Sequence, residues 1–172
     1  SLLNLFVVLF VGLILAFGCQ KEEDSNNDNN DNVVGTINLN NDSYDVVDDG
    51  NIIQLINDGG TTSGSITITG SNSTNTLMVS LAIEYDNTDG ISGNYENGDN
   101  SSASHVFRPW LTQLNINKND GSSSQSYNEP DGTLEVMHNS DNNYTVDFDM
   151  TFKDSLNVVG DLTCDFIEQQ VN

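Results

Sequence analysis

The chain has 172 residues, of which 26 are acidic and 4 are basic, so its formal net charge at pH 7 is −22. Binding to nucleic acid, or to an anionic membrane surface through basic side chains, needs clustered Lys and Arg, and four such residues are too few for either. Hydrophobic residues make up only 35% of the chain, and its length suits one domain with a tail.

The first apolar segment comprises residues 2–17, where Asn4 is the only strongly polar residue and none is charged. A membrane-spanning helix needs about 20 apolar residues, so this segment fits the apolar region of a secretory signal peptide better. Such a signal begins with Met and basic residues, whereas here Ser1 comes first and no basic residue precedes Lys21. We therefore expect that the sequence starts inside its signal peptide.

The end of this apolar segment resembles the lipobox of bacterial lipoproteins. Residues 15–19 read Leu-Ala-Phe-Gly-Cys, with the cysteine where the apolar run stops. The resemblance implies that the thiol of Cys19 carries diacylglycerol and that residues 1–18 are a signal peptide. The sequence departs from the family pattern at two positions, since Ala16 stands where Leu is usual and Phe17 where a small residue is usual. The alternative is a transmembrane anchor with an incidental cysteine.

The residues after Cys19 resemble the surface-export signal of Bacteroidota lipoproteins, because Lys21 is followed by the acids Glu22 and Glu23. In that group such a tag directs the protein to the outer leaflet of the outer membrane. The resemblance implies a lipid-anchored protein that faces the cell exterior; the alternative is an ordinary charged start of a linker. Apart from the cysteine, residues 19–32 have no apolar side chain, so we expect a flexible acidic tether.

Beyond residue 32 the apolar residues follow a period of two, the pattern of strands with one buried and one exposed face. The clearest segments are 35–39, 65–69, 77–85, 110–117, 132–138, 143–153 and 156–166. Between them, Gly follows Asp or Asn in turn-forming pairs at 49–50, 58–59, 89–90, 97–98, 120–121 and 131–132. The last three segments predict a three-stranded meander with a tight second turn at residues 153–157.

Helical periodicity is weak everywhere, so the crossover helices that a parallel sheet needs are not predicted. The sequence predicts an all-β fold, a single antiparallel β-sandwich or barrel of about 8–10 strands over residues 33–168, with 169–172 as a C-terminal tail. Residues 35–44 and 132–166 also resemble small β-rich lipoproteins common in Bacteroidota. That group has no settled function, so the resemblance implies fold and location only.

The many acidic residues raise the question of catalysis, because glycoside hydrolases use paired carboxylates. Asp147 and Asp149 share one face of a predicted strand, as do Asp161 and Asp165. We interpret both pairs as parts of a solvated outer face opposite an apolar core. The sequence has no nucleophile elbow, HExxH run or phosphate-binding glycine loop. We therefore predict no enzymatic activity and keep a small carboxylate-dependent hydrolase as the alternative.

A calcium site is an open alternative to a protein without a cofactor. Calcium prefers oxygen ligands from Asp, Asn and backbone carbonyls in loops, and acids are densest around Asp45, Asp48 and Asp49. The spaced Asp-x-Asp-x-Asp-Gly pattern is missing there, and Asp and Asn also populate turns for backbone reasons. The prediction is no cofactor, with calcium in the 45–51 loop as the site to test.

Residues 105–110 hold the only Trp, the only Arg and one of the two His of the chain. Aromatic rings stack on sugars, and Arg and His supply hydrogen bonds. The candidate ligand-binding residues are His105, Arg108, Trp110 and Tyr127. The alternative is that the aromatic side chains of this segment, Phe107 and Trp110, pack in the core and that the Arg pairs with a surface acid.

Two single residues complete the prediction. Cys164 lies in an alternating apolar stretch and has no cysteine left to pair with if Cys19 is lipidated, so we expect it to pack as a small hydrophobe. Residues 154–156 read Asp-Ser-Leu and resemble the O-glycosylation site of exported Bacteroidota proteins, which implies a glycan on Ser155. The sequence as a whole predicts a non-enzymatic cell-surface lipoprotein whose β domain binds an extracellular glycan or protein.

Overall fold

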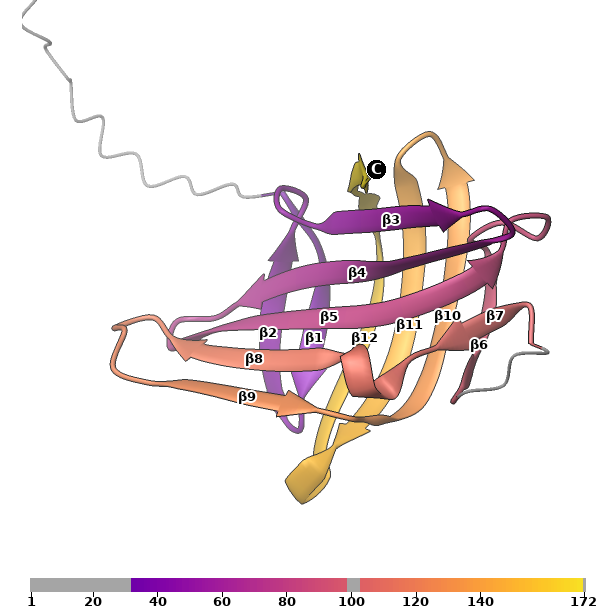
Figure 1. The fold of residues 1–172 in the computed structure, drawn as a ribbon. Helices are drawn as coiled ribbons and strands as arrows, with labels where there is room; N and C mark the ends of the chain where they lie inside the picture. Colours follow the sequence, from indigo (N-terminus) through magenta and orange to yellow (C-terminus); the bar gives the residue numbers. More distant parts are fainter. Residues whose placement is uncertain (1–31, 99–102, 172) are drawn as a thin grey trace, which may run out of the picture.

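The computed structural model describes residues 32–98 and 103–171, and this part of the chain is almost entirely β (Figure 1). The strands of the first half are β1 (Val33–Leu39), β2 (Asp42–Val47), β3 (Ile52–Asp58), β4 (Thr61–Ser71), β5 (Asn75–Asp86), β6 (Gly93–Asn97) and β7 (His105–Phe107). After the 3-10 turn η1 (Pro109–Leu111) come β8 (Gln113–Lys118), β9 (Ser124–Asn128), β10 (Asp131–Ser140), β11 (Asn143–Phe152), the 3-10 turn η2 (Lys153–Ser155), β12 (Leu156–Asp165) and β13 (Ile167–Gln170).

The strands form two layers that are joined at both sides. Figure 1 shows β3, β4, β5, β8 and β9 running across the view as a front sheet, with β2, β1, β12, β11 and β10 crosswise behind them as a back sheet. On one side β4 pairs with both β5 and β2. On the other side β7 pairs with β5 and β6, and β6 continues to β10. The hydrogen-bonded ring confirms the predicted all-β sandwich or barrel.

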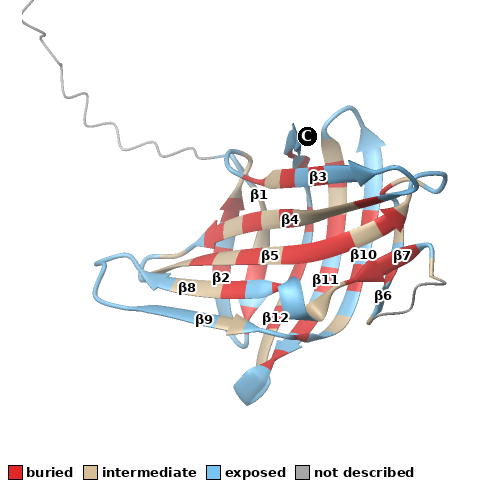
Figure 2. Ribbon diagram, viewed as in Figure 1, coloured by how far each residue is buried: buried red, intermediate tan, exposed pale blue. Residues whose placement is uncertain are grey.

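One continuous apolar core fills the space between the two sheets. The inward-facing residues alternate with exposed ones along each strand, which Figure 2 shows as red bands separated by paler ones. Packing is tight at the centre, since a Cβ built on Gly160 would lie 2.5 Å from the ring of Phe148. Every core residue lies between Ile37 and Phe166. A chain that starts at Asn32 therefore contains the whole core and the whole ring, and we expect it to fold on its own.

The outer face of the back sheet carries the predicted solvated acids. Asp147 and Asp149 on β11 and Asp161 and Asp165 on β12 are all exposed. The register places Glu135 opposite Asp147, and Asp147 in turn opposite Asp161. We call these three residues the acidic row. Like charges directly across a sheet repel one another, so this face is held by the core beneath it rather than by its surface charges.

The structure differs from the sequence prediction in its strand count and strand directions. Thirteen strands occur in the described residues, not 8–10, because several predicted loops contain short strands. Two pairs are parallel, β6 with β7 and β13 with β3. Strand β13 also extends the domain to Gln170, into the predicted tail at 169–172. The three-stranded meander over β10, β11 and β12 is confirmed, with η2 at its predicted tight turn.

The predicted strand at 110–117 is wrong over its first residues. Pro109 opens the 3-10 turn η1, in which Leu111 N–H donates to the carbonyl of Arg108. Proline has a fixed φ and no N–H to give to a neighbouring strand, so it favours a turn at this point. Strand β8 starts only at Gln113, and Leu111 is exposed rather than inward-facing.

Buried Asn51 connects the corner where the front and back sheets meet. Its side-chain N–H donates to the carbonyl of Val47 at 2.9 Å and to the sulfur of Cys164 at 3.5 Å. Its side-chain oxygen accepts from the N–H of Thr69 at 3.3 Å, and its backbone oxygen accepts from Ile167 at 2.9 Å. One residue thus joins the ends of β2 and β4 to β12 and β13. This matters because β2 and β4 pair through only Asp45–Ser71 and Val46–Gly70.

Replacing this amide tests its role. Asn51→Ala removes the partners of buried polar groups and should lower the free energy of unfolding by about 2 kcal/mol. Urea denaturation of a chain that starts at Asn32 measures this loss. Asn94→Ala on β6 is the control, because Asn94 is exposed. Equal stability of the two variants would contradict the role of Asn51.

Candidate functional site

The segment 105–110 divides into a buried part and an exposed part. His105 is buried between two tyrosines, 6.3 Å from the ring of Tyr85 and 5.1 Å from that of Tyr95. Its Nε2 lies 2.8 Å from the carbonyl oxygen of Gly90, and its Nδ1 lies 3.0 Å from Ser104 Oγ. Both ring nitrogens therefore have partners inside the protein, and this imidazole serves packing between β5, β6 and β7.

Arg108 and Trp110 form the exposed part. Arg108 Nη2 lies 2.8 Å from Glu84 Oε2, which is the surface-acid pairing that the sequence offered as an alternative. The same guanidinium lies 5.4 Å from the centre of the Trp110 ring, at a distance typical of cation–π contacts. Trp110 is 42% exposed, so it does not pack in the core, whereas Phe107 does. The ion pair holds an indole ring against the outside of β5.

Next to this ring, a hollow of about 410 Å³ crosses the outer face of the front sheet. We call it the front groove. Its lining residues are Gln54, Ile56, Ser63, Gly64, Ser65, Ser80, Ala82, Leu111, Gln113 and Val171. Ser63 pairs with Glu84, the partner of Arg108, so the groove continues toward the Trp110 ring. The groove thus runs from β13 and β3 across β4 and β5 to η1 and β8.

None of the described residues that line the front groove is charged, although the chain carries 26 acids. Its walls are apolar side chains exposed to solvent, with Ile56 at 49%, Leu111 at 61% and Val171 at 46% exposure. Its floor consists of small residues, and its polar groups are hydroxyls and amides. This surface is the opposite of the acidic row on the back sheet.

Tyr127, the fourth candidate ligand-binding residue, lies elsewhere. It is on β9, opposite Leu114, and lines a cleft between the two sheets. The structure therefore brings Arg108 and Trp110 together beside Leu111, which lines the front groove, turns His105 inward, and places Tyr127 at a different site.

The candidate calcium ligands are only partly gathered. Asp48 and Asp49 line a hollow of about 290 Å³ together with Asn32 and Val47. Asp45 is an exposed residue of β2 and does not line this hollow. Asp48 Oδ1 already accepts from the N–H of Asp165 at 3.2 Å. Across residues 32–98 and 103–171, no group of three or more His, Cys, Asp or Glu side chains is placed to hold a metal ion.

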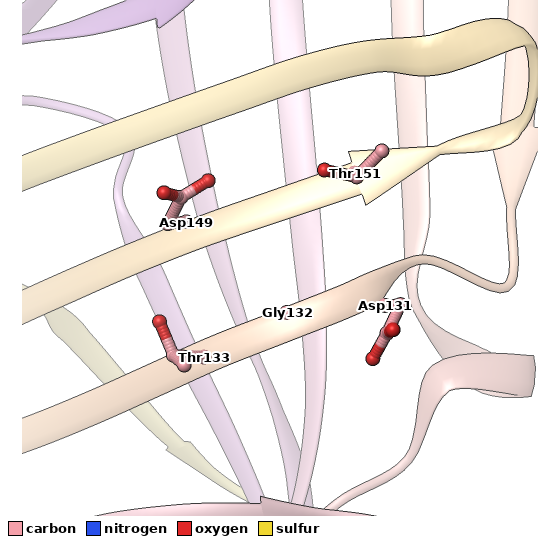
Figure 3. A pocket seen from close by; sticks show the side chains of 5 residues that line it. All are labelled: Asp131, Gly132, Thr133, Asp149 and Thr151. Carbon is pink, nitrogen blue, oxygen red and sulfur yellow. The ribbon is translucent and has the colours of Figure 1, made fainter.

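The hollow of about 410 Å³ on the back sheet contains two carboxylates, those of Asp131 and Asp149 (Figure 3). Figure 3 shows the two side chains pointing away from each other, from β10 and from β11. Each is held by an amide on the outer neighbour strand: Asn97 Nδ2 donates to Asp131 at 2.8 Å, and Asn157 Nδ2 donates to Asp149 at 2.7 Å. These amides draw the carboxylates apart, so the hollow does not present the facing acid pair that glycoside hydrolysis uses.

Ser155 and Cys164 occupy contrasting places. Ser155 is exposed in η2, at the tip between β11 and β12, where residues 154 and 155 both have positive φ. Cys164 is buried, and burial raises the pKa of its thiol to about 12, with the carboxylate of Asp48 adding to the effect. A thiol that stays protonated is a poor nucleophile.

Several predictions fall outside the described residues: the signal peptide, Cys19, and the export residues Lys21, Glu22 and Glu23.

Sequence reasoning missed most of the front groove, because its residues come from β3, β4, β5, η1, β8 and the residue after β13, and its floor consists of ordinary Ser, Gly and Ala. Leu111 falls within the predicted strand at 110–117, and the nearby Pro109, which favours a turn, is the one sequence signal against that strand. Comparison with family models, with curated proteins and with solved structures finds no match to this chain. The assignment of function therefore depends on the geometry alone.

The state of Cys164 gives a direct test of the packing around it. A chain that starts at Asn32 contains this cysteine alone, and in the folded state at pH 8 its thiol should not react with 5,5′-dithiobis(2-nitrobenzoate). One equivalent should react once guanidinium chloride unfolds the chain. Because folding raises the pKa of the thiol above its usual 9.0, the contribution of this residue to stability should be complete below pH 9 and decline above it. Rapid labelling of the folded protein would show that the thiol is accessible.

Proposed function

We propose that this protein is a non-enzymatic binding module on the cell surface, held by a lipid on Cys19 and binding an extracellular ligand through the front groove. The main support is the front groove, an uncharged, partly apolar surface on a domain whose other faces carry acids. Exposed apolar patches of this kind mark binding sites on soluble domains.

The chemistry of the front groove suits an uncharged ligand. Seven large hydrophobic side chains are exposed among the described residues, and three of them, Ile56, Leu111 and Val171, line the groove. Hydroxyls and amides between them can donate and accept hydrogen bonds. A charged ligand would lose its hydration without finding a counter-charge on the groove lining. A volume of about 410 Å³ also falls within the range of small-molecule and glycan sites.

A neutral glycan is the candidate ligand that Trp110 favours. The indole ring is exposed, and its contact with Arg108 limits its motion, so less entropy is lost when a sugar ring stacks on it. A protein ligand with a small apolar segment is the other candidate for the same groove. The opposed directions of Asp131 and Asp149 support a binding role over the hydrolase alternative.

The acidic surface supports an exposed location. The acidic row faces solvent on the back sheet, and net negative charge favours solubility and keeps neighbouring molecules apart. No helix that the structure describes has the length and hydropathy needed to cross a bilayer. An acidic tether of residues 19–32 and a lipid on Cys19 would hold such a domain at the outer membrane, facing the cell exterior.

Introducing a charge into the front groove tests the binding face. Leu111→Asp should abolish binding to an array of neutral glycans, because the ligand would have to cover an unpaired carboxylate. Met137→Asp is the matched control, since Met137 is also an exposed hydrophobic residue, on β10, and lies outside the groove. Trp110→Ala should lower binding about tenfold or more if a sugar stacks on the indole.

The outcomes separate the candidates. Binding that Leu111→Asp abolishes and Trp110→Ala leaves intact would place the ligand in the groove without sugar stacking. Binding that both variants leave intact would contradict the front groove as the binding site. Circular dichroism of each variant confirms that the fold is unchanged.

The proposed location has its own test in the full-length precursor. Cys19→Ala should leave the chain without lipid and uncleaved by the lipoprotein signal peptidase, which metabolic labelling with a fatty-acid analogue and electrophoresis measure. Replacing Lys21, Glu22 and Glu23 by Ala should protect the domain from external protease on intact cells. Continued digestion of that variant would refute the export signal while leaving the lipid anchor intact.

A further inference from the structure

A second cleft, separate from the front groove, lies between the two sheets at one end of the barrel. Its volume is about 370 Å³, and we call it the mouth cleft. Its lining residues are Leu39, Asp42, Tyr44, Asn75, Ile116, Lys118, Ser123, Gln125, Tyr127 and Leu156. The first three of these come from β1 and β2 of the back sheet, and β8 and β9 of the front sheet face them.

The cleft is open because the edges of the two sheets do not meet there. Strand β9 pairs with β8 only, so its other edge has no strand partner in the described part of the chain. Strand β2 pairs with β4 only through Asp45 and Val46, so its first residues are free of the front sheet. In Figure 1, β8 and β9 extend past β2 at this end. The cleft therefore opens to solvent between β9 and β2, while the core beneath it stays buried.

Along the inward face of each strand the residues change from apolar to polar as the strand reaches the cleft. On β8 the sequence is buried Leu114, then half-buried Ile116, then exposed Lys118. On β5 and β2 the change takes one step, from Leu77 to Asn75 and from Tyr44 to Asp42. The cleft thus has an apolar bottom continuous with the core and a polar rim that contains both a cation and an anion.

Two hydrogen-bond donors in the cleft have unused capacity. Lys118 has no carboxylate within 4.0 Å among the described residues, since the only ion pair there joins Arg108 to Glu84. The hydroxyl of buried Tyr44 accepts from Asn75 Nδ2 at 3.5 Å, but its own proton reaches no acceptor in the described part of the chain. In a protein with 26 acids and 4 bases, a Lys without an acidic partner beside a cleft points to an anionic ligand.

We propose that the mouth cleft binds a one-ring sugar acid, with its carboxylate at Lys118 and its hydroxyls at Asp42, Asn75 and Gln125. The ring of half-buried Tyr127 offers a face for the C–H groups of the sugar, beside Ile116 and Leu156. The Tyr44 hydroxyl donates to a ring or hydroxyl oxygen at the bottom.

The rim selects this class of ligand over two simpler ones. A bare aliphatic carboxylate would use Lys118 and the apolar bottom but would leave Asp42 facing an apolar chain, at the cost of removing its hydration. A cation would pair with Asp42 but would meet the ammonium of Lys118. A hydroxylated carboxylate satisfies both groups, because Asp42 accepts from sugar hydroxyls while Lys118 pairs with the acid.

Three sugars of the same ring size and different charge test the proposal: glucuronate, glucose and glucosamine. Each is titrated into ¹⁵N-labelled protein that starts at Asn32, and amide shifts in β8 and β9 report binding. Glucuronate should bind at least threefold more tightly than glucose, with glucosamine weakest, since an exposed ion pair contributes up to about fivefold in affinity. Because β8 also reaches the front groove through Gln113, shifts in β9 and at Lys118 report the mouth cleft, and shifts near Ser63 and Ser80 report the front groove. The two proposals therefore stand or fall separately.

Two substitutions locate the effect. Lys118→Gln should remove the preference of the protein for glucuronate over glucose, whereas Lys153→Gln, the same charge change at exposed η2, should keep it. Asp42→Asn should weaken binding of both sugars, because it weakens the acceptor for their hydroxyls. Equal affinity for all three sugars, or shifts in the front groove alone, would overturn the proposal.

Discussion

The side-chain amide of Asn51 supports a corner of the barrel where the two sheets share few backbone hydrogen bonds. Strands β2 and β4 meet through two residue pairs, and Asn51 adds bonds to Val47, Thr69 and Cys164 around them. Because this corner is fixed locally, β2 does not have to pair with the front sheet along its whole length. The mouth cleft lies where the first residues of β2 are not paired with the front sheet.

The two sheets share a core but differ on their outer surfaces. The back sheet carries the acidic row, in which Glu135, Asp147 and Asp161 stand directly across from one another. The outer face of the front sheet carries the front groove, which is lined by small, neutral residues and exposed Leu111. The outer faces of the two sheets thus differ in charge, and the front groove lies on the side away from the acidic row. A β domain does not need the acidic row or the exposed apolar side chains of the front groove in order to fold. We therefore relate both surfaces to the proposed binding function.

The sequence alone predicts those parts of the fold that depend on local pattern. The alternation at 143–153 and 156–166 predicts β11 and β12 to within a residue or two, because one buried and one exposed face follow from the strand period. The error at 110–117 has a local cause too, since Pro109 favours a turn over an extended strand. Neighbouring residues decide both outcomes.

Long-range features are less accessible to such reasoning. The burial of Asn51 depends on Cys164, which is distant in the sequence, and nothing in the turn at residues 48–51 distinguishes this Asn from the many others. The front groove and the mouth cleft have the same property, because each gathers single residues from several strands whose register the pattern does not give. Trp110, likewise, contacts Arg108, which pairs with Glu84 on another strand, and the local sequence does not predict that pairing.

The direction of β1 has a mechanical consequence. The strand runs from Val33, next to the point where the chain enters the domain, to Leu39 at the mouth cleft, a length of about 20 Å. Figure 1 shows the C-terminus at the same end as the start of β1. The start of β1 and the mouth cleft thus lie at opposite ends of this strand, so the proposed attachment through the N-terminal segment would leave the cleft at the end away from the tether. A pull along that tether would act parallel to β1, which is hydrogen-bonded on both sides, to β2 and to β12.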